Sequence, residues 1–212
     1  MTRPEIALGT AQWGMAYGIA NRTGQATASD VVTMLGMARG AGVDTLDTAR
    51  AYGSAEAVIG RALDGDAAFR VVAKLSPTIC DQADRVREAT EASLRASCDA
   101  LHRAELDVVL LHRPEHRTED GGAAWDALRH ARDAGSVGAI GVSATSPETA
   151  LEALDDSEVA VMQVAASLLD RRLETVGFFK GATAGGVEVH VRSVYLQGVA
   201  FMPIHTLPAH LS

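Results

Sequence analysis

The sequence predicts an α/β protein of the (β/α)8 TIM-barrel type, incomplete, with about seven strands and the last βα unit missing. Short apolar runs rich in Val, Ile and Leu alternate with helix-like stretches along all 212 residues, which is the pattern of consecutive βα units around a parallel sheet. Three of these runs end on an ionisable residue, Asp47, Lys74 or His112. Such residues fall at the carboxyl edge of the sheet, where the active sites of these folds lie.

The expected strands are short apolar runs bounded by turn-forming or charged residues. They fall at residues 6–10, 45–47, 70–75, 106–112, 139–143, 159–164 and 187–195. Helical periodicity and capping residues place helices between them. These are expected at 30–39 after Ser29, 55–63 after Ser54, 84–101, 123–134, 148–154 after Ser146-Pro147, and 169–180, with Gly40, Gly42, Gly65 and Gly135 as C-caps.

The first predicted strand favours a barrel over an open doubly wound sheet. Residues 8–14 read Leu-Gly-Thr-Ala-Gln-Trp-Gly and lack the GxGxxG turn of dinucleotide-binding sheets. A complete barrel takes about 250 residues and eight βα units, whereas only residues 199–212 follow the seventh strand and its turn. We therefore expect a barrel over 1–198 and a short C-terminal tail over 199–212.

Composition narrows the class of partner and compartment. A hydrophobic content of 47% suits one large core, and no apolar run is long enough to span a bilayer. The formal charge of −8 disfavours nucleic acid as a partner. Residues 1–5 show no signal-peptide pattern, so we expect a cytoplasmic protein in which Cys80 and Cys98 are reduced thiols.

The segment 47–56 reads Asp-Thr-Ala-Arg-Ala-Tyr-Gly-Ser-Ala-Glu and resembles the DTAxxYGxxE signature of the aldo-keto reductases. The resemblance covers nearly all of the chain in the family's order. It includes LGTA at 8–11, VAKL at 72–75, VLLHRP at 109–114, IGVS at 140–143, LLDRR at 168–172 and RSVYLQG at 192–198.

The resemblance implies a catalytic tetrad of Asp47, Tyr52, Lys74 and His112. Carbonyl reduction needs a proton for the oxygen and stabilisation of its developing charge. Tyr52 would be the general acid, and Lys74 would lower the pKa of its phenol. Asp47 would keep Lys74 charged, and His112 would orient the substrate oxygen. This chemistry requires no metal.

The resemblance also implies an NADP(H) site. The implied cofactor-binding positions are Thr10, Asp47, Ser143, Gln163, Arg192, Ser193, Leu196 and Gly198. Ser143 and Gln163 match residues that bind the nicotinamide carboxamide, and Arg192 stands where many members stack an aromatic ring. In the family, the adenosine phosphate of NADP is bound largely by a region that follows the position of Gly198. Only residues 199–212 follow that position here, which brings NADP(H) binding into question.

The run from His112 to His116 fits HxxEH, a zinc-protease pattern whose ligands lie one helical turn apart. Here the first histidine ends a predicted strand and Pro114 follows, so helical spacing is not expected. We therefore predict no metal site.

Three functions remain open from the sequence. The first is NADP(H)-dependent reduction of a small or sugar-like carbonyl with Tyr52 as general acid. The second is a cofactor-independent lyase, isomerase, dehydratase or cyclase that uses the same tetrad for acid–base chemistry. The third is a non-catalytic interaction protein.

An incomplete barrel leaves strand edges whose backbone groups invite pairing. We therefore expect a homo-oligomer, or another partner, to cover the open edge. The alternative is a tail folded across the opening.

Overall fold

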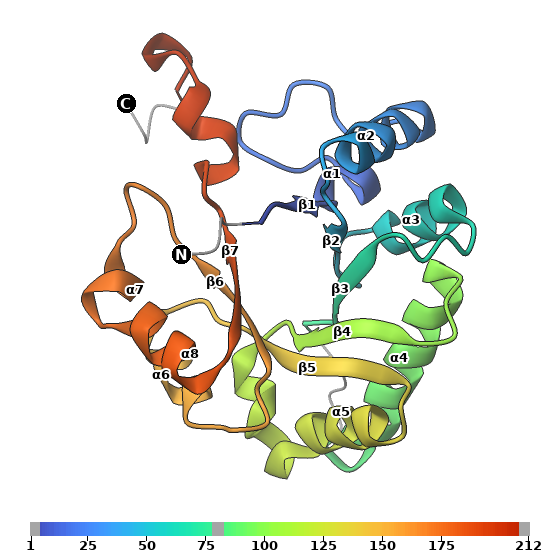
Figure 1. Ribbon diagram of the computed structural model, residues 1–212, viewed down its shortest axis with the longest axis vertical. Helices are drawn as coiled ribbons and strands as arrows, with labels where there is room; N and C mark the ends of the chain where they lie inside the picture. The colour runs from blue at the N-terminus through green and yellow to red at the C-terminus, as the bar shows by residue number, and fades with distance from the viewer. Residues whose placement is uncertain (1–4, 78–82, 208–212) are drawn as a thin grey trace.

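The structure, a computed structural model, describes residues 5–77 and 83–207. Its seven strands are parallel and pair in chain order, and Figure 1 shows them as a ring with the helices outside. The strands are β1 (Ala7–Gly9), β2 (Thr45–Asp47), β3 (Arg70–Lys74), β4 (Leu106–Leu111), β5 (Val137–Ser143), β6 (Val161–Ala165) and β7 (Glu188–Arg192). The predicted fold class, an incomplete (β/α)8 barrel, is confirmed.

The helices follow the strands as expected for βα units. They are α1 (Ala11–Gly14), α2 (Ala28–Gly40), α3 (Ala55–Leu63), α4 (Val86–Leu101), α5 (Ala123–Asp133), α6 (Pro147–Leu154), α7 (Arg172–Thr175) and α8 (Phe178–Gly185). Short 3-10 helices are η1 (Ala83–Arg85), η2 (Pro114–Arg117), η3 (Glu119–Gly122), η4 (Leu196–Phe201) and η5 (Ile204–Thr206). Within the described residues, no helix has the length and apolar character needed to cross a membrane.

The start of α2 differs from the sequence prediction. Thr27, not Ser29, is the N-cap, because its side chain accepts a bond from the backbone N–H of Asp30 at 3.2 Å. The Asp30 carboxylate in turn accepts from the Thr27 backbone N–H at 2.9 Å. Because of this reciprocal capping box, α2 begins at Ala28, two residues earlier than predicted.

Three further boundaries differ for local backbone reasons. The single helix expected at 169–180 is two helices, α7 and α8, separated by Gly177 at φ 77°. The strand expected to reach 195 ends at Arg192, because Ser193 takes φ 62° and leaves the extended region. Asp64, not Gly65, is the left-handed C-cap of α3.

The barrel interior is divided into an apolar layer and a polar layer. Val72, Val108, Leu110 and Val161 form a buried cluster inside the ring. Alternate residues of a strand share a face, so the residues two positions further along β3, β4 and β6 face the same interior. They are Lys74, His112 and Gln163. The sheet therefore places these three polar side chains directly above the buried apolar cluster.

The ring is open between β7 and β1. In the described residues β1 pairs only with β2, and β7 only with β6. On the carboxyl side of the opening the Ala20 backbone N–H donates to the Gln197 carbonyl at 3.2 Å, so η4 contacts the loop that precedes α2. Figure 1 shows the segment that contains η4, coloured red, beside that loop, coloured blue.

Candidate active site

An ion pair between Lys74 and Asp47 lies at the centre of the polar layer. The Lys74 side chain is only 1% exposed, and its ammonium contacts Asp47 Oδ1 and donates to the Thr48 carbonyl at 3.0 Å. Burial lowers the pKa of Lys74, while the charge of Asp47 and its hydrogen bond act in the opposite direction. Asp47 therefore supports the charged form of an amine that has almost no water around it.

Gln163 connects this pair to the neighbouring strand. Its Nε2 donates to Asp47 Oδ1 at 2.8 Å, and its Oε1 lies 3.5 Å from the Ser143 hydroxyl. Both Gln163 and Ser143 are buried. The two residues that the resemblance assigned to a carboxamide are thus in contact with each other and with the tetrad aspartate.

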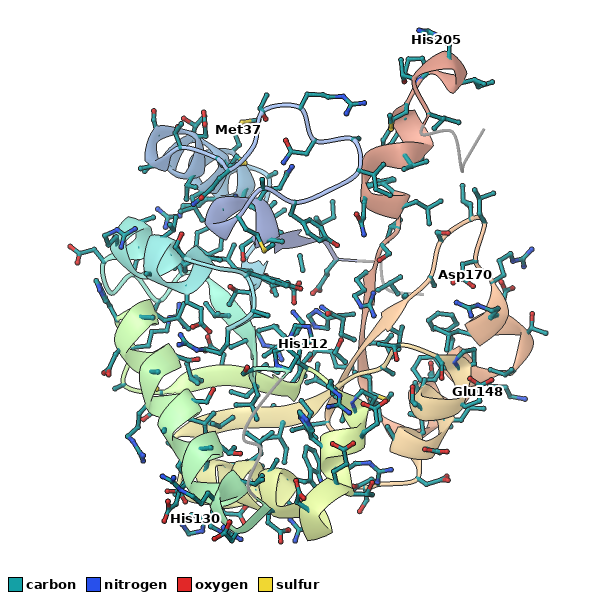
Figure 2. All side chains as sticks on the ribbon, turned by 180° about the vertical axis from the view of Figure 1, so that it is seen from behind. Met37, His112, His130, Glu148, Asp170 and His205 are labelled. Atoms are coloured by element: carbon teal, nitrogen blue, oxygen red, sulfur yellow. The ribbon has the colours of Figure 1, made fainter. Side chains whose placement is uncertain are left out.

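Tyr52 and His112 complete the group of four. Their rings meet edge to face with centroids 6.2 Å apart, and Lys74 Nζ lies 5.1 Å from the centre of the Tyr52 ring. Figure 2 shows His112 inside the ring of strands. Asp47, Tyr52, Lys74 and His112 therefore converge above the apolar floor.

The loop that presents Tyr52 depends on a close approach to α1. A Cβ added to Gly14 would lie 1.7 Å from the Tyr52 carbonyl oxygen, so only glycine fits there. Glu56, also buried, ties the same region together by contacts with Arg50 Nη1 at 2.6 Å and the Ser97 hydroxyl at 3.0 Å. Gly14 and Glu56 are the last residues of the motifs at 8–14 and 47–56, but the sequence analysis predicted no supporting role for either.

The pKa of the Tyr52 phenol is raised, not lowered as expected for a phenol beside Lys74. The main cause is burial of the phenol, followed by the negative charge of Asp47. The positive charge of Arg192 acts in the opposite direction but is outweighed. Tyr52 is therefore protonated at neutral pH and carries a proton that it can donate.

His112 is held in its neutral form. Its pKa is lowered, first by burial and then by the charges of Lys74 and Arg192. A neutral imidazole keeps one N–H donor and one acceptor. It can donate a hydrogen bond to a substrate oxygen without adding a charge.

Arg192 ends β7 and reaches across to β5. Its guanidinium lies 3.4 Å from the Ala144 carbonyl and 3.5 Å from the Ser193 hydroxyl. The remaining predicted cofactor positions make backbone and loop contacts around this group. Thr10 is buried and donates to the Asp47 carbonyl at 2.9 Å, whereas Leu196 and Gly198 lie in η4 against the loop that contains Ala20.

The HxxEH segment does not form a zinc site of the helical kind. His112 follows β4, and His116 lies in η2, where its Nε2 is 3.6 Å from Glu119. Across residues 5–77 and 83–207 no group of three or more His, Cys, Asp or Glu side chains could hold a metal ion. Cys98 is a free cysteine, and Cys80 lies outside the described residues.

A model of the aldo/keto reductase family matches residues 5–202. The chain belongs to the aldo/keto reductase family. Among curated proteins it is similar to the oxidoreductase sirO of Leptosphaeria maculans, with 32% identity over 143 residues. That match covers 66% of this chain and 42% of the relative, so the chain spans less than half of the relative's length.

Solved aldo-keto reductases share the fold. One from Pseudomonas aeruginosa superposes with a TM-score of 0.74 at 23% identity, covering 88% of this chain and 72% of that one. A holo form from Bacillus halodurans gives 0.74 at 21%, with 97% and 66% covered. A Bombyx mori aldo-keto reductase in complex with NADP gives 0.66 at 20%, with 91% and 63% covered.

Proposed function

We propose that this aldo/keto reductase family member is an oxidoreductase that reduces a small or sugar-like carbonyl with NADPH, and that Tyr52 is its general acid. The observation that best supports this is the convergence of a protonated phenol, a buried ammonium and a neutral imidazole on one polar layer. A carbonyl oxygen placed there would meet a proton donor and a nearby positive charge.

The chain's own residues divide the work as follows. Tyr52 donates its proton to the carbonyl oxygen as negative charge develops there. Lys74 stabilises the resulting phenolate, since its Nζ lies 5.1 Å from the ring centre. His112 donates a hydrogen bond that orients the substrate oxygen, and Asp47 keeps Lys74 charged.

The hydrogen-bonding groups of Ser143 and Gln163 suit a nicotinamide carboxamide. Gln163 uses one amide N–H for Asp47 and keeps the second, and the long 3.5 Å contact to Ser143 leaves that hydroxyl able to change partner. Ser143, Gln163 and Arg192 would hold the nicotinamide end of the cofactor. The cofactor would supply the hydride that the carbonyl carbon receives.

The test is turnover of a panel of aldehydes, ketones and aldoses with NADPH. Tyr52→Phe is expected to reduce kcat by at least a hundredfold, because it removes the proton donor and preserves the ring. His112→Gln should also lower the rate, whereas His130→Gln should not, because His130 is exposed on α5 at the outer side of the barrel (Figure 2). Equal rates in Tyr52→Phe and the unmodified protein would refute the assignment.

A second function is favoured by one specific observation. Ser143 and Gln163 are almost fully buried and make hydrogen-bond contacts with each other and with Asp47, so the polar layer around the tetrad is internally bonded. The tetrad would then perform acid–base chemistry without a nicotinamide, as a lyase, isomerase, dehydratase or cyclase. Turnover that depends on Tyr52 but not on NADPH would select this alternative.

The open side of the barrel supports a proposal about assembly. The outer edges of β1 and β7 are unpaired among the described residues, and Ile6, Val191 and Val194 beside them are exposed. Unpaired edges with apolar neighbours favour strand pairing between molecules. A second copy is expected to cover them, and a monomeric mass by light scattering at micromolar concentration would contradict this.

A further inference from the structure

Arg192 carries a positive charge beside the polar layer that no described tetrad residue balances through an ion pair. Lys74 is neutralised by Asp47, with which it is in direct contact. Arg192 takes part in no ion pair with any described residue, and its two polar contacts are a carbonyl and a hydroxyl at 3.4 and 3.5 Å. With His112 neutral, the site carries one uncompensated positive charge, although the protein's formal charge is −8.

The position of this charge is set by the sheet. Arg192 is paired in register with Ala165 on β6, and its guanidinium crosses that strand to reach the Ala144 carbonyl next to Ser143. It therefore lies beside the two residues proposed to hold the carboxamide. The charge also reaches the tetrad, since it opposes the rise in the pKa of Tyr52 and contributes to the lowered pKa values of Lys74 and His112.

A nicotinamide changes charge when it is oxidised. The reduced ring is neutral and the oxidised ring is a cation, while the rest of the cofactor is the same in both forms. An unpaired cation beside the ring repels only the oxidised form. The interaction of two unit charges near a protein surface is large enough to change a binding constant about tenfold or more.

We propose that Arg192 makes the site select the reduced cofactor over the oxidised one by charge repulsion, so that NADPH binds more tightly than NADP⁺. The inference rests on the proposed function, because it requires that the nicotinamide lie at Ser143 and Gln163. The consequence is directional: the site takes up NADPH, and the oxidised cofactor with its cationic ring is released more readily.

The test is the ratio of the two dissociation constants, Kd for NADP⁺ over Kd for NADPH, measured by isothermal titration calorimetry at fixed ionic strength. Contacts that both cofactor forms make contribute equally to the two dissociation constants, so their contribution cancels in the ratio. Arg192→Gln, which removes the charge and keeps a planar amide, is expected to lower the ratio about tenfold. Arg192→Lys should keep most of it.

A matched control separates local from general electrostatics. Lys180→Gln removes one positive charge from the exposed side of α8 and should leave the ratio unchanged. Folding of each variant is checked by circular dichroism. Because Arg192 is only partly buried and weakly bonded, its replacement should not unfold the chain.

The outcomes distinguish this inference from the proposed function. A ratio that falls in Arg192→Gln but not in Arg192→Lys or Lys180→Gln supports the inference. Binding of both cofactor forms with the same ratio in all variants overturns the inference and leaves the reductase assignment standing. Absence of binding of either form to the unmodified protein overturns both.

Discussion

The Asp47–Lys74 pair offers the sharpest test of the energetics of the site. Asp47→Asn removes the carboxylate that forms an ion pair with the Lys74 ammonium, whose side chain is 1% exposed. Breaking a buried pair by removing one partner typically destabilises a protein by about 3–5 kcal/mol. The upper limit comes from the lysine itself, which can lose its proton at neutral pH at a cost of about 4.6 kcal/mol from a reference pKa of about 10.4. The Asn side chain still offers an oxygen, so we expect a loss of about 3 kcal/mol.

The reverse substitution should be milder. Lys74→Met leaves Asp47 with the Gln163 bond at 2.8 Å and a side chain that is 16% exposed, so about 1–2 kcal/mol is expected. The double variant places an apolar chain beside a neutral amide and leaves no buried charge. It should therefore be at least about 2 kcal/mol more stable than the sum of the single effects predicts.

Denaturant unfolding of the four proteins measures this cycle, with the slope checked for constancy. Single effects that add within about 0.5 kcal/mol would refute the reasoning, because the two side chains would then be energetically independent. The pH dependence is a second check. In Asp47→Asn the unfolded chain binds the lysine proton more readily than the folded one, so the deficit should shrink as pH rises toward about 10.4.

Three other predictions follow from single contacts. Gly141→Ala should destabilise the barrel by more than about 3 kcal/mol in thermal unfolding, because a Cβ there would lie 1.7 Å from the Val161 carbonyl oxygen. As a control, Gly36→Ala in α2 places a Cβ with no atom within 4 Å and should stabilise the protein by up to about 1 kcal/mol. Thr27→Ala should lower the free energy of unfolding by about 1 kcal/mol through loss of the capping box, and an unchanged value would contradict the cap. Tyr52→Phe should leave the tyrosinate absorbance at about pH 11 unchanged, because burial raises the pKa of that phenol; a decrease would show that Tyr52 ionises normally.

Local sequence patterns were sufficient to predict where the strands lie and which polar residues end them. A buried parallel strand is a continuous apolar run, so 45–47, 70–75 and 106–112 could be recognised one at a time, together with Asp47, Lys74 and His112. Helix ends were harder to place, because a capping box and a glycine at positive φ compete with neighbouring signals. Thr27 and Gly177 decided two of them.

The sequence by itself therefore determined the strand order, the polar residues at the strand ends and the family signature, because each of these is written within a few consecutive residues. Only the tertiary structure decided how those residues share charge. Gln163 and Asp47 are 116 positions apart and meet through the register of the sheet. Burial then raises the pKa of Tyr52, and Arg192 has no carboxylate partner in the part of the chain that the structure describes. Desolvation and charge balance depend on what surrounds a group in space, which no local pattern records.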